Sequence, residues 1–279
     1  MIVVTGSTGK LGGRVARRLA DLGVPQRLLV RDAARAPTLP GAEVVTADYT
    51  DQASVRAAVD GADTLFFVSG HEVKGRVAVH RSVVDSAIQG GVGRIVYTSF
   101  LAAEPDATFT FARDHYLTEL HIRGAGVAFT FLRNSIYLDD LPEWVNDDGV
   151  IAGPAGDGRV AWVARDDIAD VAAAVLTSAG HDEKTYDVTG AVALTLDETA
   201  AALSAVLGRP VRYHAETLDE ARASRSGYGA PDWEVEGWVT SYAAIATGEL
   251  STVSDTVARV AGHEPRTIQS LFADRNARA

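Results

Sequence analysis

Short apolar, β-branched runs alternate with helix-length amphipathic stretches through the first half of this chain. The strand-like runs cover residues 2–5, 27–30, 43–47, 64–68, 94–98 and 128–132. Helices are expected between them at residues 11–22, 52–59, 77–89 and 113–123. Apolar strands joined by helix-length connections are typical of parallel sheets with helices on both faces, because hairpins need much shorter connections. The alternation therefore predicts an α/β fold with a Rossmann-type, doubly wound parallel sheet.

The regular alternation of strand-like and helix-length segments ends after about residue 134. Residues 146–149 and 153–158 are rich in Gly, Asp and Pro and are expected to be turns or loops. A helix at 166–176 and a strand at 185–188 are expected to return to the main sheet. Thr195 with Glu198 three residues later predicts a capped helix over 195–207, and from residue 211 a mostly helical segment is expected. We therefore predict two domains, residues 1–149 and a smaller, mainly helical lobe over 150–279.

Composition excludes several classes of protein. The 279 residues include no cysteine, which excludes disulfides, thiolate metal sites and a cysteine nucleophile. The formal net charge of −11 argues against nucleic-acid binding. No apolar run approaches the ~18 residues of a membrane span, and a strand-like run from residue 2 leaves no room for a signal peptide, so a cytoplasmic location is expected. The seven histidines include no i, i+4 pair, and no metal is expected.

A glycine-rich turn follows the first strand and opens the first helix, with the spacing G-x-x-G-x-x-G. Glycine permits a tight turn and lets the backbone approach a diphosphate closely, while the helix directs unpaired N–H groups at the phosphates. Without a ligand, the same pattern would be an ordinary strand-to-helix turn. Its position favours dinucleotide binding, which makes residues 1–149 an NAD(P)-binding domain and the lobe a substrate-binding one. The turn comprises Gly6, Ser7, Thr8, Gly9, Lys10, Leu11 and Gly12.

The end of the second strand distinguishes the two nicotinamide dinucleotides. A carboxylate there binds the ribose hydroxyls of NAD, whereas an arginine meets the 2′-phosphate of NADP. Arg31 occupies this position, and Lys10 adds a second positive charge. Asp32 leaves the alternative open, because its carboxylate could bind hydroxyls instead. We expect NADP(H) to be preferred, with NAD(H) as the alternative.

Further cofactor contacts are expected where the third, fourth and fifth strands end. Open α/β sheets bind ligands at the carboxyl ends of their strands. The end of the third strand lies where an adenine would, and the small residues at the end of the fourth strand would let the dinucleotide pass. These candidates are Asp48, Tyr49, Val68, Ser69, Gly70, Thr98 and Ser99.

With these motifs the chain resembles the NmrA-like group of atypical short-chain dehydrogenases/reductases. Within that group it is most similar to NADPH-dependent quinone reductases of the type-2 quinone oxidoreductase kind. The resemblance implies a Rossmann fold of six or seven parallel strands with a smaller C-terminal lobe, and a substrate bound between them. The matching segments are residues 5–12, 30–32, 47–51, 97–100, 115–119 (pattern H-x-x-T-E), 132–134, 153–158 and 165–167.

The chain departs from the wider superfamily in its proton relay. That superfamily uses a Tyr-x-x-x-Lys pair, in which lysine lowers the pKa of the tyrosine. Tyr116 has the tyrosine spacing, but Leu120 stands in place of lysine, and no lysine lies between Lys74 and Lys184. Quinone reduction needs no strong base, so hydride transfer to a quinone-like or polycyclic aromatic substrate is favoured over alcohol oxidation. His115 is the first candidate for a proton donor.

Weaker candidates complete the expected site. Tyr116 and His71 are further candidate proton donors, with His71 also a candidate substrate contact. The other candidates for binding an aromatic substrate are Phe100, Asn134, Tyr137 and Trp144. Two alternative functions stay open: a non-catalytic NAD(P) redox sensor, and a tailoring oxidoreductase or oxygenase of aromatic natural-product biosynthesis. A homodimer is also kept open.

Overall fold

The computed structural model describes residues 1–278, and backbone packing divides the chain into two units. Unit 1 comprises residues 1–100, 114–133 and 165–186. Unit 2 comprises residues 101–113, 134–164 and the chain from residue 187 onward. The chain therefore leaves unit 1 and returns to it twice. The division at residue 149 into cofactor-binding and substrate-binding domains stays a prediction, because it concerns roles that the backbone does not assign.

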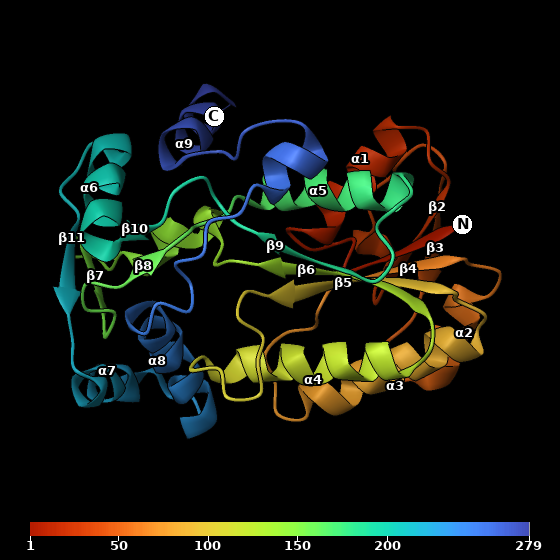
Figure 1. Ribbon diagram of the computed structural model, residues 1–279, viewed down its shortest axis with the longest axis horizontal. Helices are drawn as coiled ribbons and strands as arrows, with labels where there is room; N and C mark the ends of the chain where they lie inside the picture. Colours follow the sequence, from red (N-terminus) through yellow and green to blue (C-terminus); the bar gives the residue numbers. More distant parts are fainter. Residues whose placement is uncertain (279) are drawn as a thin grey trace. The chain divides into compact units, whose positions relative to one another are not determined.

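A seven-stranded sheet forms the centre of unit 1, in the order β3-β2-β1-β4-β5-β6-β9 (Figure 1). β1 pairs in parallel with β2 and β4, and the β2–β3 and β4–β5 pairs are parallel as well. The reversal of strand order at β1 is the feature of a doubly wound sheet. The predicted fold class is confirmed. The strands are β1 Ile2–Thr5, β2 Gln26–Val30, β3 Ala42–Thr46, β4 Thr64–Phe67, β5 Arg94–Phe100, β6 Ala128–Asn134 and β9 Lys184–Val188.

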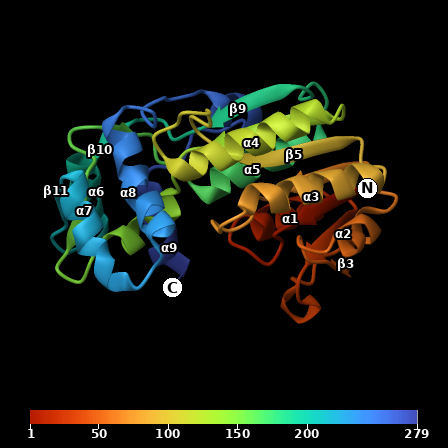
Figure 2. The ribbon, with the colours of Figure 1, turned by 90° about the horizontal axis from the view of Figure 1, so that it is seen from below.

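Helices cover both faces of this sheet. α1 and α5 lie on one face, and α2, α3 and α4 lie on the other, with α3 and α4 side by side (Figures 1 and 2). α1 and α5 are joined by Arg18, whose guanidinium donates to Asp170 at 2.5 Å and to Asp166 at 2.9 Å. The helices are α1 Gly12–Asp21, α2 Gln52–Val59, α3 Arg76–Gln89, α4 Thr110–Gly124 and α5 Arg165–Thr177.

The core between the sheet and α2–α4 holds the carboxyl ends of the central strands in place. Leu65, Phe67, Ile95 and Tyr97 are completely buried there, and Phe131 of β6 joins the same cluster. Burial of whole aromatic and branched side chains supplies the main stabilisation of such a layer. The strand ends that border the predicted site therefore project from a closely packed base.

Unit 2 combines helices with two small sheets. β8 Arg159–Val160 pairs antiparallel with β10 Leu194–Thr195, and β7 Val150–Gly153 pairs parallel with β11 Arg212–Ala215. The helix predicted after Thr195 is confirmed, with its capping box formed to Glu198. The expectation of a mostly helical segment from residue 211 is confirmed, apart from β11, which is short and mostly exposed. The helices are α6 Leu196–Leu207, α7 Leu218–Arg225, α8 Asp232–Ala246 and α9 Ile268–Arg278.

Short helical turns occur at Ala33–Arg35 (η1), Leu138–Trp144 (η2), Ser226–Tyr228 (η3) and Val257–Ala261 (η4). Within residues 1–278, every helix is too short or too polar to cross a membrane.

Candidate functional site

The glycine-rich turn is closed on itself by close backbone contacts. Gly6 has a φ of +60°, and the N–H of Gly9 donates to the carbonyl of Gly6 at 2.8 Å. A Cβ at Gly12 would lie 2.4 Å from that carbonyl oxygen and 2.7 Å from the oxygen of Thr5. Neither backbone oxygen can move without opening the turn. Gly12 is therefore required for the helix to begin directly against the strand.

The start of α1 suits an anionic group. Leu11 is the residue before the first turn of α1, and within residues 1–278 its side chain caps none of the helix N–H groups. The first turn holds no acidic residue. Uncapped N–H groups and the positive end of the helix dipole attract phosphate. The hydroxyl of Ser7 is buried in the same turn with no hydrogen-bond partner among the described residues. A dinucleotide diphosphate fits this turn, because it would supply acceptors to both the N–H groups and the hydroxyl.

The acidic residues near Arg31 are engaged in their own loops. Asp32 accepts a hydrogen bond from the N–H of Ala34 at 3.0 Å and caps η1. Asp48 accepts from the hydroxyl of Thr50 at 2.6 Å and from its N–H at 2.8 Å. These bonds, chiefly the one from the hydroxyl, hold the pKa of Asp48 below its usual value, and the Arg31 charge acts in the same direction. Arg31 is exposed, which leaves it suited to a 2′-phosphate.

Side chains from β1, from the loop after β3 and from β5 hold the turn that follows β4. The hydroxyl of Thr5 accepts from the N–H of Val68 at 2.8 Å, and the hydroxyl of Tyr49 donates to the Val68 carbonyl at 3.1 Å. The hydroxyl of Thr98 accepts from the N–H of Ser69 at 2.8 Å. Gly6 also packs here, because a Cβ on it would lie 3.1 Å from Cβ of Val68. The structure thus brings the predicted residues of four separate segments together.

A buried ion pair lies at the end of β5. The hydroxyl of Ser99 donates to Glu119 at 2.6 Å, and Glu119 is completely buried. Arg133 of β6 donates to both carboxylate oxygens of Glu119, at 2.9 and 2.8 Å, and Arg123 lies 3.3 Å away. Bidentate pairing of this kind fixes geometry as well as charge. The Ser99 side chain is therefore bonded to the protein, and its predicted cofactor contact stays a prediction.

His115 lies in a buried polar network rather than at an exposed surface. Nη2 of Arg76 lies 3.1 Å from Nε2 of His115, and the hydroxyl of Tyr97 lies 2.9 Å from Nδ1. Arginine can only donate, so Nε2 carries no proton and Nδ1–H donates to Tyr97. Burial, followed by the charges of Arg76 and His80, lowers the pKa of His115 well below its usual value. His115 is therefore a buried, neutral imidazole in this structure, and its proton-donor role stays a prediction.

The remaining candidates have different surroundings. Tyr116 of α4 is half-buried, and His71 is exposed. The Phe100 ring lies 6.1 Å from the His115 ring, measured between centroids. Their assignments as catalytic or substrate residues stay predictions.

Three predicted substrate residues belong to unit 2. Asn134 is completely buried, and neither its amide oxygen nor its amide nitrogen has a hydrogen-bond partner within residues 1–278. Tyr137 is half-buried and forms an isolated parallel bridge with Val163. Trp144 packs in an aromatic cluster, 5.1 Å from the ring of Trp162 and 4.6 Å from that of Tyr242. Trp144 is half-buried in this cluster, and its assignment as a substrate residue stays a prediction.

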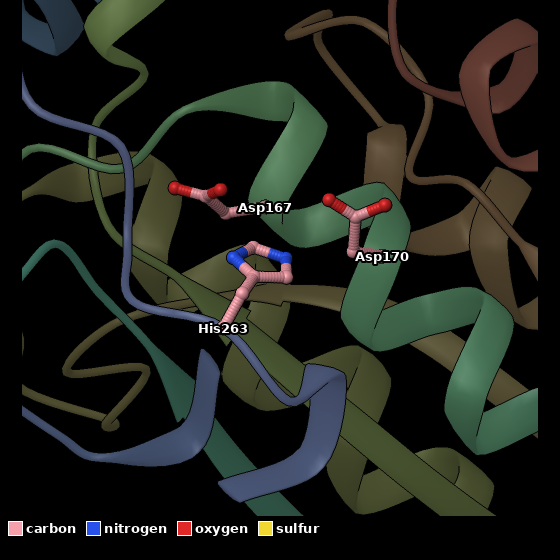
Figure 3. Close-up of side chains that lie close together, drawn as sticks. All are labelled: Asp167, Asp170 and His263. Carbon is pink, nitrogen blue, oxygen red and sulfur yellow. The ribbon is translucent and has the colours of Figure 1, made fainter. Parts of the chain in front are cut away.

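Asp167 and Asp170 of α5 carry side chains of the kind that can bind a metal ion. Figure 3 shows Asp167 and Asp170 one turn apart on α5. Asp170 is already paired with Arg18. His263, drawn in the same figure, belongs to unit 2, so the three side chains do not form a site within one unit. The expectation that the chain holds no metal stays a prediction.

The sequence interpretation did not assign three buried residues of this region. Arg76 is only 2% exposed, and the carboxylates of Glu72 and Asp114 lie 3.9 and 4.0 Å from its guanidinium. His80 and Glu119 are completely buried. The H-x-x-T-E pattern could have indicated Glu119, because residues four apart share one helix face. No comparable local signal marks Arg76 or His80.

Comparison with known proteins extends these observations to the whole chain. A model of the NmrA-like family matches residues 1–223. The chain is 35% identical to the NAD(P)H azoreductase of Xenophilus azovorans, over 100% of this chain and 99% of that protein.

Two solved structures are similar over nearly their full length. One is the NADPH-dependent quinone oxidoreductase of Escherichia coli in complex with NADPH, with a TM-score of 0.90, 33% identity, and coverage of 99% of this chain and 100% of that one. The other is the triphenylmethane reductase of Citrobacter sp. in complex with NADP(H), with a TM-score of 0.87, 33% identity, and coverage of 98% and 99%. The similarity is therefore not confined to the glycine-rich turn.

Proposed function

This chain belongs to the NmrA-like family, and from that premise we propose that it is an NAD(P)H-dependent oxidoreductase of the atypical short-chain type. Its proposed reaction is hydride transfer to a quinone-like or other conjugated aromatic acceptor. The observation that carries the proposal is the closed glycine-rich turn, in which Gly12 has no room for a side chain and the buried Ser7 hydroxyl has no protein partner within residues 1–278. The full-length similarity to an azoreductase and a quinone oxidoreductase supports it.

NADP(H) is the proposed cofactor, with NAD(H) as a weaker alternative. The turn from Gly6 to Gly12 would hold the diphosphate, and the exposed Arg31 would pair with the 2′-phosphate. When bound, the reduced nicotinamide supplies the hydride. Asp32 and Asp48 each accept hydrogen bonds within their own loops, and NAD(H) is the alternative in which a carboxylate would bind the ribose hydroxyls.

The acceptor is proposed to be electron-poor and conjugated. Quinones, azo compounds and triphenylmethane dyes, which the names of the similar proteins mention, are all conjugated groups that take up hydride without a catalytic base. This chain has no lysine in the Tyr-x-x-x-Lys position and holds His115 neutral and buried. Reduction of a quinone to a hydroquinone takes one hydride and one proton, and water can supply that proton.

Steady-state oxidation of NADPH, followed by its absorbance, tests the proposal. The purified chain is incubated with a quinone, an azo dye and a triphenylmethane dye, each with a matched reaction lacking protein. We expect turnover with at least one of the three. Absence of turnover above the protein-free rate, combined with tighter binding of one redox form of the cofactor, would favour a redox sensor instead. Equal affinity for both forms would exclude the sensor, because only differential binding shifts a population.

A cytoplasmic location and a homodimer are kept as proposals. The absence of cysteine means that the chain needs no oxidising compartment for disulfide formation. Light scattering after size-exclusion chromatography would give the mass of the assembly, against 29.4 kDa for one chain.

A further inference from the structure

A fourth side chain binds the turn after β4, and it comes from a helix rather than a strand end. The N–H of Gly70 donates to Nε2 of His80 at 3.0 Å. His80 lies in the first half of α3 and is completely buried. With the bonds from Thr5, Tyr49 and Thr98, this one means that each of Val68, Ser69 and Gly70 has a backbone group bound by a side chain.

The contacts of His80 define its tautomer. Nε2 accepts from Gly70, so the proton of the neutral ring is on Nδ1. Nδ1 lies 3.0 Å from the hydroxyl of Thr118, which itself donates to the carbonyl of Asp114 at 2.8 Å. Nδ1–H therefore donates to Thr118. Each hydrogen bond from the Gly70 N–H through His80 and Thr118 to the Asp114 carbonyl thus has a donor and an acceptor. Burial, with the Arg76 charge, lowers the pKa of His80 to about 3, so the ring is a neutral acceptor at physiological pH.

Aromatic neighbours restrict the orientation of the imidazole. The Phe67 ring packs against it edge-on, with centroids 5.1 Å apart and an interplanar angle of 75°. The Tyr97 ring lies 5.9 Å away in a similar orientation. A Cβ on Gly70 would lie 3.5 Å from Nε2, so the Gly70 backbone rests directly on the ring. The imidazole is thus a rigid support between the α3–α4 layer and the turn.

From these contacts we propose that His80 is a positioning residue, which fixes the backbone of Val68-Ser69-Gly70 in the conformation that binds the dinucleotide. The inference rests on the proposed function, because it assumes that the cofactor passes over the carboxyl end of β4. His80 acts through Gly70 and does not itself touch a reacting atom. Fixing the turn before binding reduces the ordering that the cofactor must impose, and so it increases affinity.

Three variants test this role by measuring NADPH binding and steady-state kinetics. His80→Leu leaves the N–H of the half-buried Gly70 without its acceptor, and we expect the Kd and KM for NADPH to rise about 5- to 150-fold. The KM for the quinone should change less than the KM for NADPH, since His80 holds the turn that we propose binds the dinucleotide. His80→Gln places an oxygen acceptor at a similar reach, and we expect it to restore NADPH affinity to within about threefold of the wild-type value.

Thr118→Val is the matched control. It removes one partner of the buried imidazole, but the Tyr97 hydroxyl, 3.4 Å from Nδ1, can still accept from that atom. The bond from Gly70 to Nε2 therefore stays in place, and NADPH affinity should change by less than about threefold. A general loss of core packing would weaken binding in Thr118→Val and in His80→Gln as much as in His80→Leu. That pattern would overturn the positioning role.

A measurement on the wild-type protein keeps the proposal testable if His80→Leu does not fold. The ¹⁵N chemical shifts of His80 should show a proton on Nδ1 and none on Nε2 at neutral pH. A proton on Nε2 would overturn the proposal, because that atom could not accept from Gly70. Failure of the proposed function would look different: the wild-type protein itself would not bind NADPH. If the wild type binds and a folded His80→Leu variant binds equally well, only the His80 inference fails.

Discussion

Acidification should destabilise this protein through its buried histidines, and His80 allows the effect to be calculated. Its pKa is about 3 in the folded chain against an ordinary value of 6.5. The folded state thus binds fewer protons than the unfolded state between these two values. The contribution of His80 to the free energy of unfolding is fully present above the unfolded pKa. It is lost as the pH falls toward the folded pKa, with a slope of about 1.4 kcal/mol per pH unit for one proton.

Integration of this slope from pH 7 to pH 5 lowers the free energy of unfolding by about 2 kcal/mol for His80 alone. His115, whose pKa is also lowered by burial, contributes in the same direction. The total loss therefore includes at least these two groups, together with any change in the carboxylates. His80→Gln removes one titrating group and leaves the others in place.

Urea titrations of the wild type and of His80→Gln at pH 7, 6 and 5 measure this difference. We expect the wild type to lose about 2 kcal/mol more than His80→Gln between pH 7 and pH 5. The variant is compared with itself at each pH, so a constant change in packing cancels. Parallel pH dependence in the two proteins would refute the reasoning, because it would mean that His80 has the same proton affinity in both states.

Three further variants and one control variant test the cofactor site and the buried ion pair at the end of β5. Arg31→Ala should weaken NADPH binding about 10- to 100-fold in calorimetric titrations and leave NADH binding nearly unchanged, whereas an equal loss for both would mean that Arg31 is structural. Gly12→Ala introduces a Cβ 2.4 Å from the Gly6 carbonyl oxygen and should abolish measurable dinucleotide binding in the same titrations. Gly124→Ala, whose Cβ would meet nothing within 4 Å, is its control and should bind normally. Glu119→Gln should lower the free energy of unfolding in urea by about 3 kcal/mol, because it leaves Arg133 without its carboxylate, and an unchanged free energy would show that the pair adds no stability.

Much of unit 1 could be predicted from local sequence. Its strands are apolar runs bounded by turn residues, and the predicted ends differ from the observed ones by two residues at most. The glycine-rich turn was predicted because its spacing and its place after the first strand are both local. The resemblance to the NmrA-like family is confirmed over residues 1–223. β11 was missed because it has four residues, mostly exposed, and a strand of that kind carries little hydrophobic periodicity.

The polar network beneath the site could not be predicted in the same way. The sequence shows that His115 and Glu119 share a face of α4, but not that this face meets β5 and α3. The proton positions on His80 and His115 follow from Gly70 and Arg76, each of which is distant in sequence from the imidazole it contacts. His115 was predicted as a proton donor from its residue type, whereas its burial, which lowers its pKa, is determined by the fold.

The order in which unit 1 is assembled along the chain has a consequence for its biosynthesis. α5 and the edge strand β9 come from residues 165–188, after the chain has passed through part of unit 2. A nascent polypeptide that has reached residue 149 still lacks the helix that covers α1 and the last strand beside β6. Until the ribosome has added about forty more residues, β6 is an open edge. A gene truncated after residue 149 would encode a sheet in which β6 has the same unpaired edge. To produce unit 1 alone, one would have to keep residues 165–186 and remove the segment of unit 2 that precedes them, residues 134–164.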